Sequence, residues 1–213
     1  LGPFRGQAAA RLVAEALWDA LPLRRCSGPA GRRAAPCAPA QLGVALCPCD
    51  GSLDPAAYRP VVERLVAGGE HDPGLLLAPL AARVESLARE GRFEEAGWVR
   101  DRHHALARAV ERRRAWRALA GGGLVCAEHP EGGGALIDHG RLAAAWEAGA
   151  RPPLLPLPDG AAPPPEVPAD PGDAEEADLL WRWLGKPGVR LLEASGALAL
   201  PAWPVSRLER VEV

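Results

Sequence analysis

The first part of the chain carries apolar residues at the spacing of amphipathic helices. In residues 7–21 they recur at steps of three and four, so they share one face of a helix, which Pro22 ends. A second helix is predicted after Asp54, a helix-capping residue type, because proline follows at the first helical position. Its apolar face continues to Gly68 and Gly69, where we expect the helix to end.

A helical hairpin is predicted at about residues 75–118, within a helical region of residues 53–120. One apolar stripe extends from Leu77 to Leu87, Gly91 interrupts it, and the helical spacing then resumes. Two helices joined by a glycine-centred turn pack as an antiparallel pair. The positions that continue the stripe on the second helix are Phe93, Ala96, Arg100, His103, Ala107 and Val110.

Short apolar runs replace the helical pattern in residues 121–149. Residues 124–128, 135–138 and 141–145 are separated by glycine-rich turns, which predicts a small β-meander. Residues 150–172 hold a dense series of prolines, which favours an extended linker.

The last segment, residues 173–213, is predicted to be a small α/β element. Residues 173–184 have an acidic start and helical spacing, and residues 189–193 and 197–200 are expected to pair as strands across a Ser-Gly turn, before a last short helix. Together the patterns predict an α+β fold. Its first half is mainly helical, and a Pro-rich linker separates the small β-meander from the mixed α/β C-terminal part.

Composition and charge argue against a strongly basic nucleic-acid-binding protein and against a membrane protein. Hydrophobic residues make up 48% of the chain, which is enough for a core, and a formal net charge of -2 gives no global basic field for nucleic acid. No apolar run reaches the roughly 18 residues that cross a bilayer, so we expect a cytoplasmic protein with no membrane partner. The chain has no Met and begins at Leu1, so we expect a fragment. A local arginine cluster, which we interpret as a solvated helix end, is Arg112, Arg113, Arg114 and Arg117.

Four of the five cysteines crowd into residues 22–52, a segment with too few aliphatic side chains to build a core of its own. In a reducing compartment such a group indicates a metal or cluster site more than disulfides. The alternative is a set of reduced cysteines packed in a loop. The candidate ligands are Cys26, Cys37, Cys47 and Cys49, and Cys126 lies outside the group.

Other polar groups do not form a recognisable catalytic site. We interpret His71, His103 and His104 as surface or packing residues, because His103 lies on the hairpin stripe and His104 beside it points elsewhere. Residues 121–123 are glycines but lack the Lys and Ser/Thr of a phosphate loop. The carboxylates expected to form a solvated helix start are Asp170, Asp173, Glu175 and Glu176. We assign no catalytic residue.

Several motifs follow one another in a specific order. A Gly-Pro-Phe turn at residues 2–4 precedes a helix that ends in the pattern P-L-R-x-C at residues 22–26, and a cysteine stretch follows at residues 37–51. The hairpin then carries Phe93-Glu94-Glu95-Ala96 and Arg100-Asp101. This order resembles the UvrC family of bacterial excision-repair nucleases after their GIY-YIG domain, and the hairpin is similar to the UVR motif of UvrB and UvrC. The second half resembles actinobacterial proteins in which a DEDD exonuclease domain is fused to UvrC-like sequence.

In that family the UVR motif docks a partner protein, so the resemblance implies that this hairpin binds UvrB or a similar protein. Gly97 stands where the family usually has alanine, at a helix cost of ~1 kcal/mol. From sequence alone, the alternative is an ordinary hairpin whose Phe93 fills its own core. The residues assigned to partner binding are Leu80, Phe93, Glu94, Glu95, Ala96, Arg100 and Asp101.

The resemblance also places Cys26, Cys37 and Cys49 at positions where an iron-sulphur cluster has been attributed to some family members. The third cysteine of the family falls at Ala45 here, and Cys47 replaces it only if the loop shifts. The implied cofactor is therefore an iron-sulphur cluster or a zinc ion at the cysteine loop.

These implications define the predicted function. We expect a non-catalytic, partner-docking segment of a UvrC-like nucleotide excision repair nuclease, with DNA reached through the parent protein. The GIY-YIG or DEDD domain would precede Leu1, so the chain alone is expected to lack nuclease activity. The alternative is a metal-binding UVR-motif adaptor that regulates a protease or chaperone, and a third reading is a helical structural domain without a partner.

Overall fold

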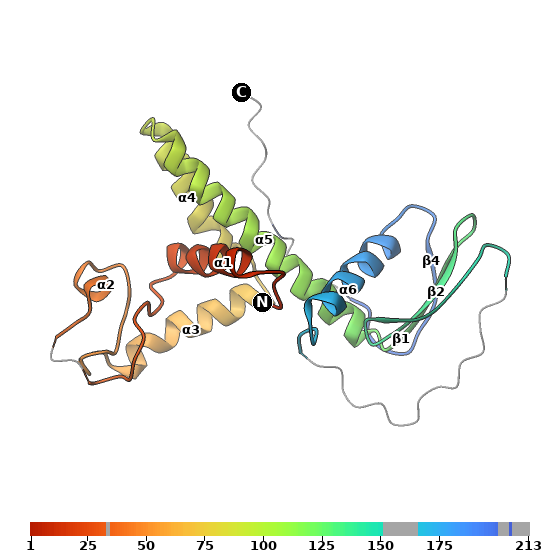
Figure 1. The fold of residues 1–213 in the computed structure, drawn as a ribbon, viewed down its shortest axis with the longest axis horizontal. Coiled ribbons are helices and arrows are strands. Elements are labelled where there is room, and N and C mark those ends of the chain that lie inside the picture. Colours follow the sequence, from red (N-terminus) through yellow and green to blue (C-terminus); the bar gives the residue numbers. More distant parts are fainter. Residues whose placement is uncertain (33–34, 151–165, 200–204, 206–213) are drawn as a thin grey trace. The chain divides into compact units, whose positions relative to one another are not determined.

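The computed structural model describes residues 1–32, 35–150, 166–199 and 205 of the chain (Figure 1). Within them the chain folds as two compact units. A helical unit contains Gly6–Val110, and a mixed unit contains Leu1–Arg5 and the described residues of Glu111–Ala202. Because the boundary falls inside one long helix, each unit is described by itself.

The helical unit holds most of the predicted helices. Its described elements are α1 (Gln7–Ala20), the single-turn α2 (Ala38–Gln41), α3 (Pro55–Glu70), α4 (Gly74–Arg89) and the first part of α5 (Phe93–Gly121). The helices predicted at residues 7–21 and after Asp54 are confirmed. The Asp54 carboxylate caps α3, because it accepts a hydrogen bond from the Ala56 N–H at 2.9 Å.

The end of α3 differs from the prediction. The helix passes through Gly68 and Gly69 and ends at Glu70. Gly68 is buried, and a Cβ atom added there would clash with the side chain of Leu76 in α4. Gly68 is therefore a point of close helix packing and not a stop signal, since packing against α4 offsets its unfavourable helix propensity of ~1 kcal/mol.

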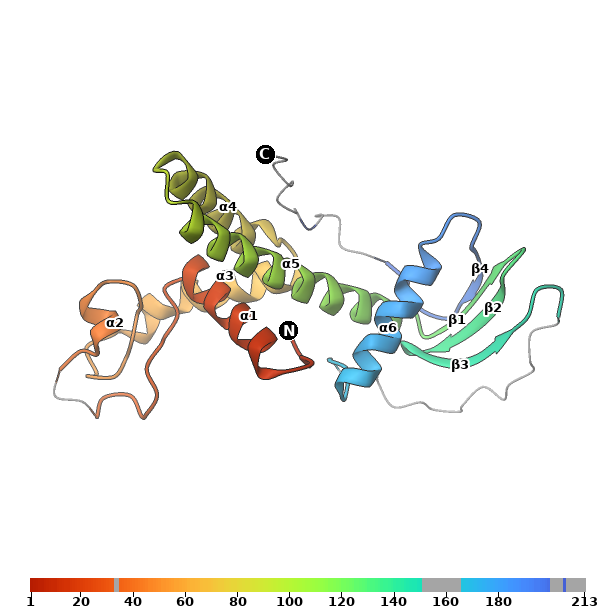
Figure 2. The ribbon, with the colours of Figure 1, turned by 45° about the horizontal axis from the view of Figure 1, so that its top comes forward.

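The predicted helical hairpin is formed by α4 and α5, which lie side by side in both views (Figures 1 and 2). Gly91 ends α4 in the left-handed conformation, with a φ of +74°. Its N–H donates to the Ala88 carbonyl at 3.0 Å, and the Arg92 N–H donates to the Leu87 carbonyl at 2.9 Å. These two bonds make a Schellman motif, which satisfies the last carbonyls of α4 and directs the chain back into α5.

The buried face of α5 differs from the predicted stripe. Ala96 and His103 are buried as predicted, but Phe93 and Arg100 are exposed and Val99 is buried. An α-helix turns by about 100° per residue, so a face centred on Ala96, Val99 and His103 directs Phe93 away from α4. The buried apolar side chains of the hairpin include Leu76, Leu77, Leu80 and Leu87 of α4, and Ala96, Val99, Leu106, Ala107 and Val110 of α5.

The mixed unit is an antiparallel sheet with a helix. Its strands are β1 (Leu124–His129), β2 (Gly133–Asp138), β3 (Arg141–Trp146) and β4 (Arg190–Ala194), in the order β3-β2-β1-β4, and its helix is α6 (Pro171–Leu184). The predicted β-meander is confirmed, since β1 pairs with β2 and β2 with β3. The α+β fold class is therefore confirmed.

The predicted pairing of β4 is wrong. Residues 190–194 pair antiparallel with β1, and no strand occurs among the described residues 197–199. Ser195 continues the contact with β1, because its N–H donates to the Leu124 carbonyl at 3.0 Å and its Oγ accepts from the Leu124 N–H at 2.8 Å. The N–H of Gly196 donates to the Gly122 carbonyl at 3.0 Å. The Ser-Gly step is therefore a close backbone contact and not a hairpin turn.

One core joins the sheet to two helices. Ile137 and Val125 occupy facing positions on β2 and β1, and both are fully buried. The C-terminal part of α5 and one face of α6 cover them. The buried members of this core are Trp116, Leu119, Ala120, Val125, Ala135, Ile137, Ala177 and Leu180. The last predicted segment thus shares a core with the β-meander.

The acidic start of α6 is solvated only in part, since Asp170 is exposed as predicted but Asp173 is buried. Asp170 caps the helix by accepting the Asp173 N–H at 3.0 Å. Asp173 is buried and accepts a hydrogen bond from Arg141 of β3 at 2.6 Å. Glu176 accepts the Leu142 N–H at the same strand. Asp173 and Glu176 therefore attach α6 to β3, and Glu175 pairs with Arg5.

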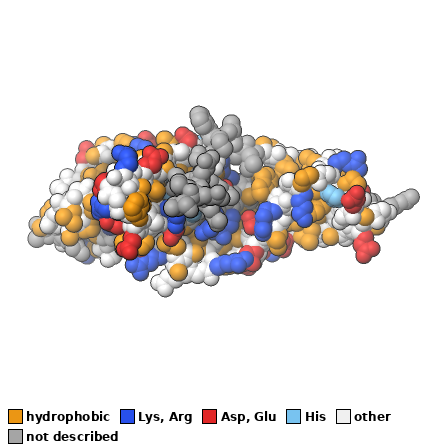
Figure 3. All heavy atoms as spheres, turned by 90° about the horizontal axis from the view of Figure 1, so that it is seen from above, with side chains coloured by type: hydrophobic (Ala, Val, Ile, Leu, Met, Phe, Trp, Pro, Cys, Tyr) orange, Lys and Arg blue, Asp and Glu red, His pale blue; other side chains and the backbone are white. Residues whose placement is uncertain are grey.

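The arginine cluster of α5 also differs from its prediction. Arg114 is buried, Arg112 and Arg113 are half-buried and Arg117 is exposed, so the cluster is not wholly solvated. In Figure 3, basic and acidic side chains are interspersed among apolar ones over the described part of the face in view. Among the described residues, no helix is both long and apolar enough to span a membrane. Residues 151–165 of the predicted linker and the predicted last helix lie outside the described residues.

Candidate functional site

The turn of the hairpin is bordered by a network of charged side chains. The Arg92 guanidinium binds Glu95 in a bidentate manner, with Nε to Oε1 and Nη2 to Oε2 both at 2.7 Å. Its Nη1 also donates to Glu90 Oε2 at 3.0 Å. Hydrogen bonds from Arg92 lower the pKa values of both carboxyl groups. Glu95, assigned to partner binding from sequence, therefore already has an ion-pair partner within the hairpin.

Two large aromatic side chains are exposed near this turn. Phe93 is 72% exposed and Trp98 is 61% exposed. Gly97 lies between them in the helix, and a Cβ added there would have no atom within 4 Å. Sequence reasoning missed Trp98, although a tryptophan beside the polar Glu94 and Asp101 positions, away from the buried face, could have indicated it. Large aromatic rings that are exposed on a protein surface gain free energy when another protein covers them.

The other residues that were assigned to partner binding divide into buried and exposed ones. Leu80 and Ala96 are buried, so they pack the hairpin and do not reach its surface. Glu94 is exposed. Arg100 and Asp101 are also exposed, and their side chains lie 3.6 Å apart. Of the residues assigned to partner binding, those exposed on the hairpin are Phe93, Glu94, Arg100 and Asp101. Trp98 is a further exposed residue of the same helix.

The second candidate site is the cysteine loop between α1 and α3. The Sγ atoms of Cys26, Cys37 and Cys49 all lie within 4.8 Å of one another. Cys47 is buried in the same cluster, beside Ala45. All five cysteines of the chain are free thiols, and Cys126 lies in β1 of the other unit. The loop therefore brings three of the four predicted sulphurs close together, and Cys47 is buried in the same cluster but lies outside that group of three.

Backbone hydrogen bonds hold this loop in place. The Gly31 N–H donates to the Pro48 carbonyl at 2.8 Å, and the Leu46 N–H donates to the Pro22 carbonyl at 2.9 Å. The Cys37 N–H donates to Cys49 Sγ at 3.3 Å. N–H groups directed at sulphur are a common feature around thiolate ligands.

The thiols of the cluster are not electrostatically equivalent. The hydrogen bond from Arg24 Nε, at 3.4 Å from Cys26 Sγ, lowers the pKa of the Cys26 thiol to about 7. At Cys37 the Ala40 N–H acts to lower the pKa, but burial and the neighbouring thiols of Cys47 and Cys49 outweigh it and raise the pKa to about 11. Neighbouring thiols therefore hinder one another's ionisation, and a bound cation would offset the repulsion between thiolates.

The donor set fits a metal. Thiolate sulphur is the preferred ligand of zinc and of iron in iron-sulphur clusters. Sulphurs bound tetrahedrally to one zinc ion at ~2.3 Å lie about 3.8 Å apart, which is within the 4.8 Å limit found for Cys26, Cys37 and Cys49. Cys47 is a further buried cysteine beside this group of three.

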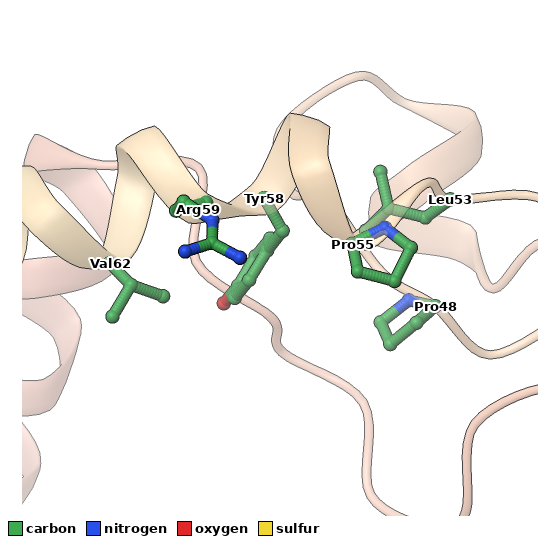
Figure 4. Close-up of a pocket in the computed structure, with 6 residues that line it drawn as sticks. All are labelled: Pro48, Leu53, Pro55, Tyr58, Arg59 and Val62. Atoms are coloured by element: carbon green, nitrogen blue, oxygen red, sulfur yellow. The ribbon is translucent and has the colours of Figure 1, made fainter.

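An apolar pocket of about 410 Å³ lies beside the cysteine loop (Figure 4). Tyr58, Arg59 and Val62 project into it from α3 (Figure 4). Its other lining residues are Pro48, Leu53 and Pro55. Sequence reasoning did not find this pocket, although its lining residues all lie within residues 48–62.

The histidines behave as packing or surface residues, as predicted. His103 is buried in the hairpin at 1% exposure, whereas His71 is exposed and His104 is half-buried.

Known proteins share this sequence over most of its length. The chain is 35% identical over 221 aligned positions, 96% of its length, to a protein of Mycobacterium tuberculosis named as a bifunctional exonuclease/endonuclease. It is 36% identical to the UvrABC system protein C of Nitratidesulfovibrio vulgaris, over 57% of the chain, and 35% identical to that of Erwinia tasmaniensis, over 52%.

These relatives are much longer than the chain, which spans 34% of the mycobacterial protein and 18% of each of these two UvrC proteins. No family model and no solved structure matches the chain. The order of motifs and the shared sequence lead to one conclusion: the chain is homologous to a segment of UvrC and of the mycobacterial exonuclease/endonuclease.

Proposed function

We propose that this chain is a non-catalytic, partner-docking segment of a UvrC-like nucleotide excision repair nuclease. Its UVR-like hairpin, α4 and α5, binds UvrB or a similar protein, and DNA is reached through the parent protein. The observation that carries the proposal is the exposure of Phe93, 72%, at the start of α5. A large aromatic side chain in this position gains free energy when a partner covers it.

The exposed side chains of the hairpin would supply the binding free energy of such a complex. Full burial of a phenylalanine side chain stabilises a complex by about 1.5–3 kcal/mol, and Trp98 is a second exposed ring of α5. Glu94, Arg100 and Asp101 supply charges of both signs around the rings, so a hairpin with a similar charge pattern could pair with them. Leu80 and Ala96 support docking indirectly, because they hold α4 against α5.

The cysteine loop is proposed to hold a structural metal. Cys26, Cys37, Cys47 and Cys49 would bind a zinc ion or an iron-sulphur cluster, which would stabilise a segment with little core of its own. The chemistry supplied by the metal is folding free energy and electrostatic neutralisation of the thiolates. The metal would thereby fix the connection between α1 and α3.

Binding to a UvrB C-terminal segment tests the docking proposal. Phe93→Asp is expected to weaken binding at least tenfold, measured by calorimetry, because it places a charge in the apolar contact. Val66→Asp is a matched control, since Val66 is an exposed apolar residue of α3 away from the hairpin turn. Phe93→Leu should retain most of the affinity. Equal affinities of Phe93→Asp and the unmodified chain would overturn the proposal.

A further inference from the structure

Arg24 connects the cysteine cluster to the rest of the helical unit. Its Nε donates to Cys26 Sγ at 3.4 Å, and its Nη2 donates to the Gly28 carbonyl. Its backbone N–H donates to the Tyr58 hydroxyl of α3 at 3.1 Å. One residue therefore contacts a ligand candidate, the loop that follows it and the helix beside it.

Cys26 is the cysteine of the cluster that most needs such support. Cys37, Cys47 and Cys49 are buried, whereas Cys26 is only partly buried. A partly exposed thiolate has fewer packing contacts to hold its direction, so a hydrogen bond contributes more to its position. The fork of the guanidinium binds Sγ and a carbonyl at once, which orients Cys26 toward the other sulphurs.

The charge of the cluster is a second reason to assign Arg24 a role at the metal centre. Four thiolates around a divalent ion leave a net negative charge, and a cation in hydrogen-bond contact with one sulphur offsets part of it. Among the described residues, Arg24 places its guanidinium in hydrogen-bond contact with a sulphur of the cluster. We propose that Arg24 is a positioning residue for the cysteine metal centre, holding Cys26 for coordination and offsetting the thiolate charge. This inference rests on the metal centre proposed above.

Arg25 provides a matched control. It carries the same charge on the adjacent residue, but its guanidinium lies 5.8 Å from the Trp18 ring and its Nη2 donates to the Trp18 carbonyl at 2.7 Å. Loss of Arg25 therefore changes the net charge by the same amount without removing the hydrogen bond to Cys26. The two variants separate contact with Cys26 from general electrostatics.

The experiment is a titration of the full chain with Co²⁺, followed by competition with Zn²⁺. Binding is read from the thiolate-to-cobalt absorption. Arg24→Gln is expected to raise the dissociation constant about 10–100-fold, the usual effect of removing an outer-sphere partner. Arg25→Gln is expected to leave it within about threefold. Arg24→Lys, which keeps the charge and loses the fork, should fall between them.

Three results would contradict the inference. Equal metal affinity of Arg24→Gln and Arg25→Gln would overturn the role of Arg24 and leave the metal centre standing. Unchanged affinity in Arg24→Gln would do the same. Absence of Co²⁺ binding by the unmodified chain would overturn the metal centre and the role of Arg24 together. Circular dichroism of each metal-loaded variant separates a loss of affinity from a loss of fold, and Arg24→Lys preserves the test if Arg24→Gln does not fold.

Discussion

Arg102 of α5 donates its Nη1 to Asp19 Oδ2 of α1 at 2.8 Å. Its Nε donates to Glu15 Oε2, one turn earlier in α1, at 3.1 Å. Arg102 directly follows the Arg100-Asp101 pair of the hairpin, and its guanidinium pairs with two carboxylates of α1 inside the helical unit. Arg100, two residues earlier, is exposed, and its Nη2 lies 3.6 Å from Asp101 Oδ1.

Loss of Arg102 is expected to destabilise the helical unit. Arg102→Met keeps the apolar stem but removes two ion pairs whose side chains are mostly buried, so the free energy of unfolding should fall by about 1–2 kcal/mol. Arg100→Met should change it by less than about 0.5 kcal/mol. Urea unfolding measures both. Equal stabilities of the two variants would mean that Arg102 contributes no more than a surface charge.

His103 is expected to make stability depend on pH. Burial, with a smaller contribution from His104, lowers the pKa of His103 in the folded state, while the unfolded chain titrates near the ordinary value of about 6.5. The unfolded state therefore takes up the proton first. The contribution of neutral His103 is fully present above about pH 6.5 and is lost as the pH falls through 6.5 toward the lowered pKa of the folded state.

The measurement compares urea midpoints at pH 7.5 and pH 5.0. His103→Leu should lose less stability on acidification than the unmodified chain, because its buried side chain does not titrate. His71→Gln, which alters an exposed histidine, should keep the original pH dependence. The same acid sensitivity in His103→Leu would rule out this source.

Two glycines of the hairpin should respond to alanine in opposite directions. Gly91 has a φ of +74°, so Gly91→Ala strains the turn and is expected to cost about 1 kcal/mol. Gly97 is helical, and a Cβ there meets nothing within 4 Å, so Gly97→Ala is expected to stabilise by up to ~1 kcal/mol. Thermal unfolding of the two variants checks the signs, and shifts in the same direction would refute the assignment.

Cys47 is expected to serve as the fourth metal ligand in place of the family position at Ala45. Cys47→Ser should weaken Co²⁺ binding at least tenfold, since a serine hydroxyl is a poor ligand for such an ion. Cys126→Ser, in the other unit, should leave binding unchanged. If Cys47→Ser binds as tightly as the unmodified chain, the site uses three cysteines.

Local pattern was sufficient for many elements of this fold. The apolar spacing of residues 7–21 predicted α1, and Asp54 predicted the start of α3, because a helix face and a cap are set by residues within one or two turns. The three strands of the meander followed in the same way, since alternating short runs and glycine turns are local. The grouping of Cys26, Cys37, Cys47 and Cys49 was also expected from their crowding in one loop.

Tertiary structure decided what depends on distant segments. Strand β4 pairs with the open edge of β1. The unpaired backbone groups of an edge can bind many strands, so the local sequence near Ser195 does not indicate which strand is the partner. Asp173 is buried because Arg141 of β3 meets it. Leu80 is buried while Phe93 is exposed, although both carry the same apolar signal, since only packing tells which side chain another helix covers. Periodicity is therefore determined by near neighbours, and exposure by the whole fold.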